Sequence, residues 1–111
     1  MTRVCRASPY RRRRLDYLAK VRAEARDVYS WSNGPGDRYG EHSHGYTKLL
    51  YCTEGAIDFR LGDGRVIQLK AGDRMVLPAG TPHSALVGAE GCTCVEGKII
   101  TIVQSRTGLS G

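Results

Sequence analysis

Residues 72–87 read GDRMVLPAGTPHSALV, and this stretch leads through a short loop into a histidine, His83. Proline fixes its own backbone and glycine adopts conformations that other residues avoid, so the segment from Pro78 to Pro82 predicts a rigid turn. Upstream, His42 and His44 are separated by a single serine. Side chains alternate between the two faces of a strand, so these two imidazoles are expected on one face.

These two segments contain all three histidines of the chain. A pair of histidines joined by a third from a returning strand is a common ligand set for divalent iron, manganese, nickel, zinc or copper. Three protein ligands also leave at least one coordination position open to water or a ligand. We therefore predict a divalent transition-metal site on His42, His44 and His83, and the sequence does not select among these metals.

The later segment resembles the second consensus motif of the cupin superfamily, G-x5-P-x-G-x2-H-x3-N. Gly72, Pro78, Gly80 and His83 match it with every internal spacing kept. Val87 stands where the motif closes with asparagine.

The earlier segment is similar to the first cupin motif, G-x5-H-x-H-x3-E-x6-G. Gly36, His42, His44 and Gly55 occupy the matching positions. Lys48 stands where cupins usually have a glutamate that binds the metal. The resemblance covers residues 36–87 and implies an antiparallel jelly-roll β-barrel of the RmlC-like type, with a metal centre inside it.

The rest of the sequence agrees with an all-β fold. From Thr47 onward, runs rich in β-branched and aromatic residues, such as 48–52, 56–61 and 65–69, alternate with glycine-bearing turns. The turns are expected at 54–55, 62–64, 71–73, 78–80 and 88–91. Short strands between regular turns favour an antiparallel sandwich or barrel. The last run, 92–103, is either one long strand or two strands divided near Gly97.

Charge separates the chain into two parts. Residues 1–30 carry nine basic and three acidic side chains, which accounts for the net charge of +6, whereas the remainder is balanced. A run of arginines at 11–14 can attract phosphates, but without interleaved aromatic residues we expect a solvated extension and no nucleic-acid partner. Leu15, Leu18 and Val21, followed by Ala25 and Val28, recur at helical spacing and predict an amphipathic helix.

These patterns give four segments. We expect a flexible basic extension over 1–13, an amphipathic helix over 14–28 that packs on the barrel, the β-barrel itself over 29–104, and a tail over 105–111. Residues 1–10 lack the apolar stretch of a signal peptide and no run is long enough to cross a bilayer, so we expect a cytoplasmic protein without a membrane partner. A barrel this small buries only part of its surface, so pairing through edge strands into a homodimer is expected, and the resemblance to cupins supports this.

The cysteines do not form a Cys-x-x-Cys pair or a disulfide framework. Cys92 and Cys94 are expected to share one strand face. They are interpreted as buried, unreactive thiols, with a soft-metal pair as the alternative.

Lys48 raises an electrostatic question. If the segment 42–48 is an unbulged strand, then His42, His44, Tyr46 and Lys48 all face the same side. A protonated ammonium does not bind a metal and repels a nearby cation. Lys48 therefore turns aside into solvent, loses its proton more easily, or marks a site without metal.

Three neutral imidazoles leave the full charge of the metal uncompensated, so a small anionic ligand such as a carboxylate, phosphate or enolate is expected. Tyr46 and Lys48 are the candidate catalytic residues, with Lys48 as a second contact for the anion. The resemblance implies dioxygenase-type chemistry, for which three-histidine cupins are known, on a small organic acid. Isomerisation or hydrolysis with the metal as Lewis acid, a non-catalytic metal- or metabolite-binding module, and a degenerate metal-free barrel are the alternatives.

Overall fold

The computed structural model describes residues 9–99, with side chains from Arg14 onward. It contains α1 (Pro9–Arg22), β1 (Ala25–Asn33), β2 (Arg38–His42), β3 (Lys48–Leu61), β4 (Val66–Lys70), β5 (Arg74–Leu77) and β6 (His83–Ile99). Residues 1–8 of the predicted extension and the predicted tail over 105–111 lie outside the described residues.

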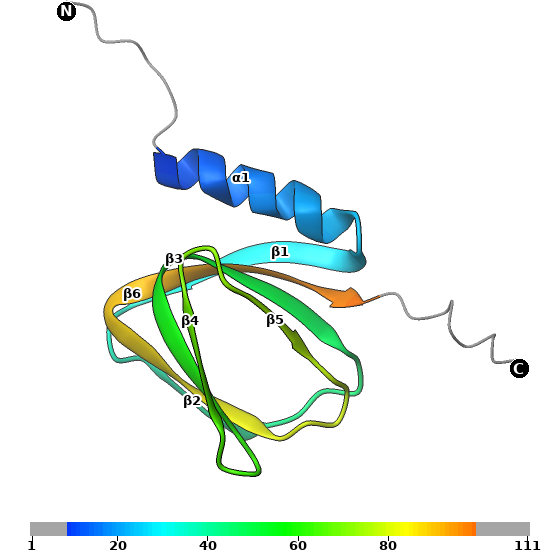
Figure 1. Ribbon diagram of the computed structural model, residues 1–111, viewed down its shortest axis with the longest axis vertical. Coiled ribbons are helices and arrows are strands. Elements are labelled where there is room, and N and C mark those ends of the chain that lie inside the picture. The colour runs from blue at the N-terminus through cyan, green and yellow to red at the C-terminus, as the bar shows by residue number, and fades with distance from the viewer. Residues whose placement is uncertain (1–8, 100–111) are drawn as a thin grey trace, which may run out of the picture.

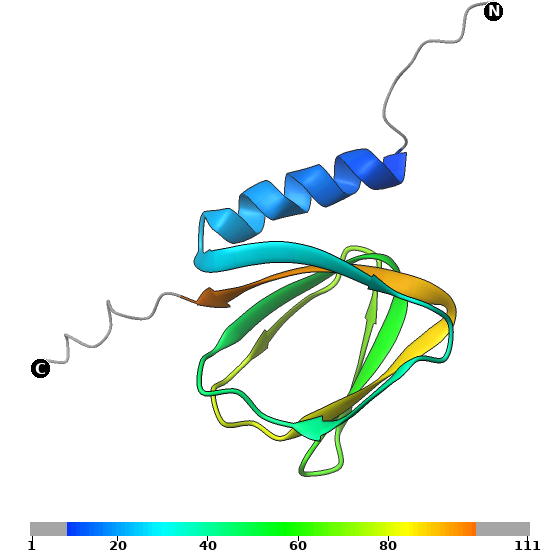
Figure 2. The ribbon, with the colours of Figure 1, turned by 180° about the vertical axis from the view of Figure 1, so that it is seen from behind.

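All strands pair antiparallel, and the long strands β3 and β6 form the centre of the arrangement. β1 and β2 pair with β6, while β4 and β5 pair with β3. In Figures 1 and 2 the sheet folds over so that its two halves face each other across the interior. The predicted jelly-roll fold is confirmed. Its edges stay open, because no ladder within residues 9–99 joins β1 or β2 to β4 or β5.

Gly55 and Gly91 bend the two central strands where they touch. Both have positive φ angles, 71° and 79°, which side-chain-bearing residues rarely adopt. A Cβ atom on Gly55 would lie 2.0 Å from the carbonyl oxygen of Gly91. The register of the β3–β6 ladder also shifts on either side of Glu54 and Gly55. The turns predicted at 54–55 and 88–91 are therefore wrong, because these glycines curve continuous strands instead of ending them.

β6 likewise continues through Gly97, so the described part of the run from Cys92 is one strand. A Cβ atom on Gly97 would lie 2.9 Å from both the Ala25 Cβ and the Val28 Cγ2 atoms. The missing side chain thus permits close contact with β1 and does not mark a break.

The helix begins at Pro9 and ends at Arg22, so the prediction of a helix over 14–28 is wrong at both of its ends. The residues after the helix instead enter β1, where Ala25 pairs with Ile99 and Arg26 with Lys98. Hydrogen bonding to β6 outweighs the helical spacing of Ala25 and Val28.

The helix covers the outer face of the sheet, as Figure 1 shows. Val21 is buried with Leu49, Tyr51 and Val95, and Tyr17 and Leu18 pack against this cluster. Leu15, expected in the same apolar stripe, is 52% exposed. The opposite face of the central strands carries the larger core, which includes Leu50, Cys52, Ile57, Phe59, Met75, Leu77, Val87 and Cys94. Alternation along β3 and β6 therefore separates a helix side from an interior side.

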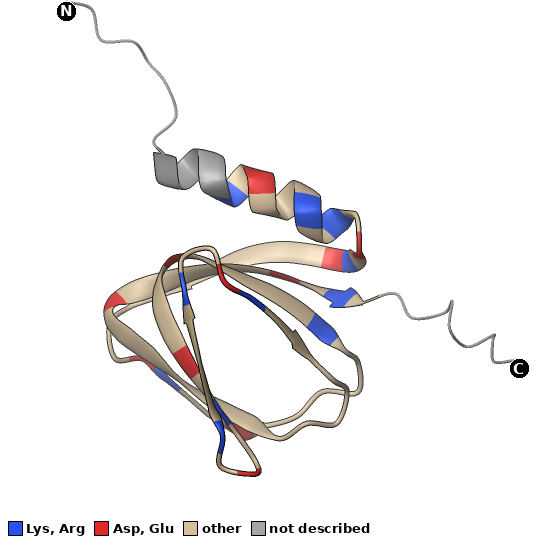
Figure 3. Cartoon of the chain, in the orientation of Figure 1, with Lys and Arg blue, Asp and Glu red and all other residues tan. Residues whose placement is uncertain are grey.

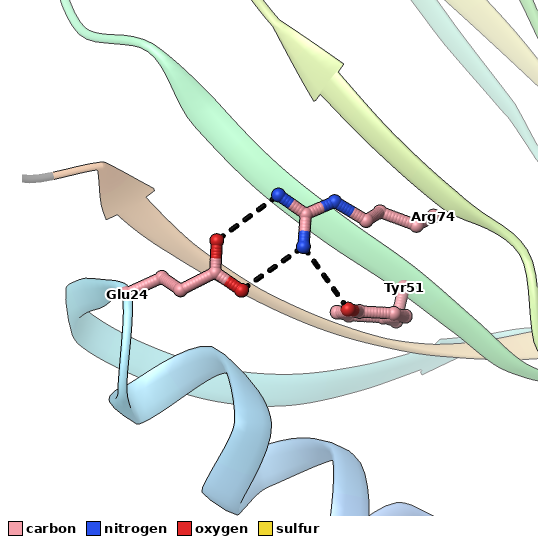
Figure 4. Close-up of polar contacts among 3 residues, drawn as sticks. All are labelled: Glu24, Tyr51 and Arg74. Atoms are coloured by element: carbon pink, nitrogen blue, oxygen red, sulfur yellow. Dashed lines mark hydrogen bonds and ion pairs between the residues drawn. The ribbon is translucent and has the colours of Figure 1, made fainter.

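Arg74 connects β5 to Glu24, in the short connection between α1 and β1 (Figure 4). Its guanidinium donates two hydrogen bonds to the Glu24 carboxylate, at 2.9 and 3.0 Å, and a third to the Tyr51 hydroxyl at 3.2 Å. The hydrogen bond from Arg74 lowers the pKa of Glu24 below its ordinary value of 4.5. This network fixes the helix relative to the sheet.

Because the pKa of Glu24 is lower in the folded state, its stabilising contribution is present above pH 4.5 and is lost as the pH falls further. Both side chains are about two-fifths exposed, so we expect Glu24→Gln to cost only about 0.5 kcal/mol at neutral pH. Urea unfolding at pH 7 and pH 3.5 measures this. The difference between wild type and variant should be smaller at the lower pH, and an unchanged difference contradicts the assignment.

Charges of both signs are distributed over the strands (Figure 3), in agreement with the balanced composition after residue 30. Among the described residues, no helix is both long and apolar enough to cross a membrane.

Candidate metal centre

The structure brings the three predicted histidines together. His42 is the last residue of β2, His83 is the first of β6, and the two are partners in the β2–β6 ladder. His44 lies in the connection from β2 to β3, so the prediction that His42 and His44 share one face of a strand is wrong, and the condition of an unbulged strand through 42–48 is not met. The ring centroids are 4.3 to 5.2 Å apart, and one nitrogen from each ring lies within 4.8 Å of the others.

Backbone carbonyls orient two of the imidazoles. The Nδ1–H of His83 donates to the Thr81 carbonyl at 2.8 Å, and the Nδ1–H of His42 donates to the Gly40 carbonyl at 2.7 Å. A carbonyl accepts only, so the proton is on Nδ1 and the lone pair is on Nε2 in both rings. Histidines that bind metals usually make such a bond with their other nitrogen.

Two nitrogens in this cluster are buried without a partner: the Nε2 atoms of His44 and His83. Buried polar atoms in folded proteins almost always have a hydrogen-bond partner, so two neighbouring exceptions call for an explanation. A divalent metal bound to the three rings would satisfy both atoms. The donor set therefore fits such a metal.

Burial lowers the pKa of both His44 and His83 below the ordinary value of 6.5, and the nearby Lys48 charge acts in the same direction. Neutral imidazole is the form that binds a metal. The environment thus favours the binding form at neutral pH.

We expect the metal-free protein to lose stability as the pH falls below 6.5. The unfolded histidines take up protons there while the folded ones resist, so acidification lowers the free energy of the unfolded state relative to that of the folded state. Urea unfolding of chelator-treated protein at pH 7.5 and pH 5.5 measures the loss. The His44→Gln variant should show a smaller loss, and equal losses in both proteins would contradict this cause.

Lys48 points into the interior and is 9% exposed, so it does not turn aside into solvent. Its Nζ atom lies 3.5 Å from Glu96 Oε1, on β6. The same carboxylate oxygen accepts a hydrogen bond of 2.8 Å from Trp31 Nε1. A carboxylate from a different strand therefore lies next to position 48, but it contacts the lysine and is not part of the group of potential metal ligands.

Sequence reasoning missed Glu96. A signal was present, because Glu96 has the same parity as Cys92 and Cys94, which both belong to the interior core. A single acidic residue on the inner side of an otherwise apolar strand indicates a buried partner or a functional group. The partner was not apparent because Lys48 lies far away in the sequence.

The lysine and the glutamate line a cavity of about 250 Å³ that also contains His42. Its other lining residues are Tyr29, Trp31, Tyr39, Phe59 and Ala85. Trp31 and Tyr39 lie edge to face in its wall, with ring centroids 6.1 Å apart. Burial and the nearby Glu96 raise the pKa of Tyr29 to about 12, so the hydroxyl of this lining residue stays protonated at neutral pH.

Tyr46, the other candidate catalytic residue, stacks on the His44 ring with centroids 5.0 Å apart. The Lys98 ammonium lies 4.8 Å from the centre of its ring. Tyr46 is not among the residues that line the cavity. Its position supports a role in holding His44 in place.

Cys52, Cys92 and Cys94 are free and buried. They lie on the interior side of β3 and β6, where Cys52 is the ladder partner of Cys94. Among the described residues, the histidines form the one group of three or more potential ligands close enough to hold a metal, and the thiols belong to no such group.

The sequence of this chain matches the protein-family model of the cupin domain over residues 30–96. The chain belongs to the cupin family. The matched region contains the three histidines together with Lys48 and Glu96. The resemblance noted in the two histidine motifs is thereby confirmed.

One curated relative is quercetin 2,3-dioxygenase from Bacillus subtilis strain 168, which is 47% identical over 55 residues. The alignment covers 48% of this chain and 16% of that protein. The cupin described here therefore matches only a small part of that enzyme.

Solved structures support the same fold. A protein with a double-stranded β-helix domain from Klebsiella pneumoniae is 28% identical, with a TM-score of 0.58, and the match covers 65% of this chain and 64% of that one. An RmlC-like cupin from Shewanella frigidimarina is 22% identical, also with a TM-score of 0.58, over 65% of this chain and 63% of that one. This cupin spans less than two thirds of either protein.

Proposed function

We propose that this cupin binds one divalent transition metal through His42, His44 and His83 and performs dioxygenase-type chemistry on a small organic acid. The observation that carries the proposal is the pair of buried, unpartnered Nε2 atoms on His44 and His83. The similarity to a dioxygenase over 55 residues favours oxygen chemistry among the reactions of metal-binding cupins.

Each side chain has a distinct part in this proposal. The Thr81 and Gly40 carbonyls hold two imidazoles in the binding tautomer, and Tyr46 stacks against the third. The cavity beside His42 provides room for a small ligand, with apolar walls from Trp31 and Phe59. When bound, a redox metal such as iron supplies the activation of dioxygen and a positive charge that attracts an anion.

The ligand is expected to be anionic because no carboxylate belongs to the described ligand group. Lys48 and Glu96 add one charge of each sign, so they do not cancel the charge of the metal. A cavity of about 250 Å³ suits a compact molecule. A small carboxylic acid that reaches from the cavity to the histidines satisfies both conditions.

The test is anaerobic loading with Fe²⁺, followed by an oxygen-uptake screen against small monocarboxylic and hydroxycarboxylic acids. We expect one class of acid to stimulate oxygen consumption in the wild type and not in His83→Gln. Metal binding without oxygen uptake or product formation would favour a non-catalytic binding module. Failure to bind Fe²⁺, Mn²⁺, Ni²⁺, Zn²⁺ or Cu²⁺ would favour a degenerate barrel.

The proposed homodimer and the proposed cytoplasmic location do not depend on the metal site. Size-exclusion chromatography with light scattering measures the first, and a doubled mass is the expected result.

A further inference from the structure

The contact between Lys48 and Glu96 is unusual because both charged side chains are buried, with side-chain exposures of 11% and 5%. Removing two charges from water costs about as much as their mutual attraction returns, so buried pairs contribute little net stability. An apolar pair of similar size would serve the core equally well. The stability of the fold therefore does not explain why charges occupy these positions.

The position of the pair suggests another role. Lys48 and Glu96 lie in the wall of the cavity that also contains His42. Trp31 donates to the same carboxylate oxygen that contacts Lys48, which fixes the orientation of Glu96. A ligand bound at the histidines and extending into this cavity would meet an immobilised ammonium and carboxylate at once.

Electrostatics then distinguishes between ligands. One negative charge on the ligand is attracted by a metal held on neutral imidazoles. A second negative charge, placed in the cavity, would gain from Lys48 but would be repelled by Glu96 at nearly the same distance, and such terms are strong in a poorly solvated site. Without Glu96, the lysine would be free to bind that second charge.

We propose that Glu96 is a specificity-determining residue which engages Lys48 and thereby prevents the lysine from favouring dianionic ligands over monoanionic ligands of similar size. This inference rests on the proposed metal site. It adds to the proposed preference for small anions that a second carboxylate on the ligand brings no advantage, and it revises the role of Lys48 from a free anion contact to one partner of a neutral pair.

The test uses the full chain loaded with Co²⁺, and the probes are propionate and malonate, which differ by one carboxylate in place of a methyl group. Probe binding is followed through the visible absorption of the bound cobalt at pH 7.5. We expect Glu96→Gln to raise the affinity for malonate relative to propionate by about tenfold. The Lys48→Met/Glu96→Gln double variant has the net charge of the wild type and should return the ratio to within about twofold of the wild-type value.

Glu96→Gln leaves a lysine unpaired in the interior and could prevent the variant from folding. A second variant, Lys48→Met, therefore tests the same inference independently. Lys48→Met should shift the ratio in the opposite direction, against malonate, by about tenfold. Bound cobalt with an unchanged ratio in every folded variant would overturn this inference alone. A wild-type protein that binds no cobalt would overturn the proposed function and the inference together.

Discussion

Replacing His83 with glutamine is expected to weaken metal binding by at least about 100-fold, since even residues that only support a metal ligand change affinity by 10- to 100-fold. His83 is 1% exposed, and the Thr81 carbonyl holds its ring with Nε2 directed away from that bond. Isothermal titration with Zn²⁺ measures the affinity directly. A glutamine of similar size keeps the interior filled, so the effect should be on binding and not on the fold.

The control is Ser84→Ala, one residue further along β6, where the side chain belongs to the opposite face. It should bind Zn²⁺ like the wild type. The metal should also raise the urea midpoint of the wild type and of Ser84→Ala, because a ligand that binds only the folded state stabilises it by about 2.7 kcal/mol at 100 times its dissociation constant. An equal rise in His83→Gln would show that the metal binds elsewhere.

Replacing Gly55 with alanine is expected to give the largest loss of stability, of about 3 kcal/mol or more, by combining a strained backbone with a steric overlap. The added Cβ atom would lie 2.0 Å from the Gly91 carbonyl oxygen and 2.8 Å from the carbonyl carbon. These are backbone atoms in the middle of β6, so they cannot rotate away. Urea unfolding with a two-state fit measures the change.

Gly36→Ala is the matched control, because Gly36 has a similar φ of 75° but no atom within 4 Å of an added Cβ. This variant should lower the free energy of unfolding by about 1 kcal/mol, because it introduces only the strained backbone conformation. The difference between the two variants isolates the overlap at the contact of β3 and β6. Equal losses would mean that the strands separate there without difficulty.

The histidine cluster was predictable because its signal is chemical and local. His42, His44 and His83 exhaust the histidines of the chain, and the rigid loop before His83 has its own proline and glycine signature. Their convergence did not need the predicted strand geometry, since His44 reaches the others from a connection between strands.

The element boundaries were harder to predict because local and long-range signals conflict. The spacing of Ala25 and Val28 suits a helix, yet both lie in β1, which pairs with β6 on either side of Val28. Gly55 and Gly91 look like turn residues, and only the contact between them shows that they bend continuous strands. Glu96 could be recognised as unusual from its parity, but its pairing with Lys48 depends on the fold.

The curvature of β6 joins features that look independent in the sequence. His83 stands at the start of this strand and Glu96 near its end, with Gly91 at the bend between them. The angle at that bend therefore sets how far apart the imidazole and the carboxylate lie. Under the proposed function, substitutions around Gly91 would change this separation, and with it the ligand preference, without altering any atom that contacts the ligand.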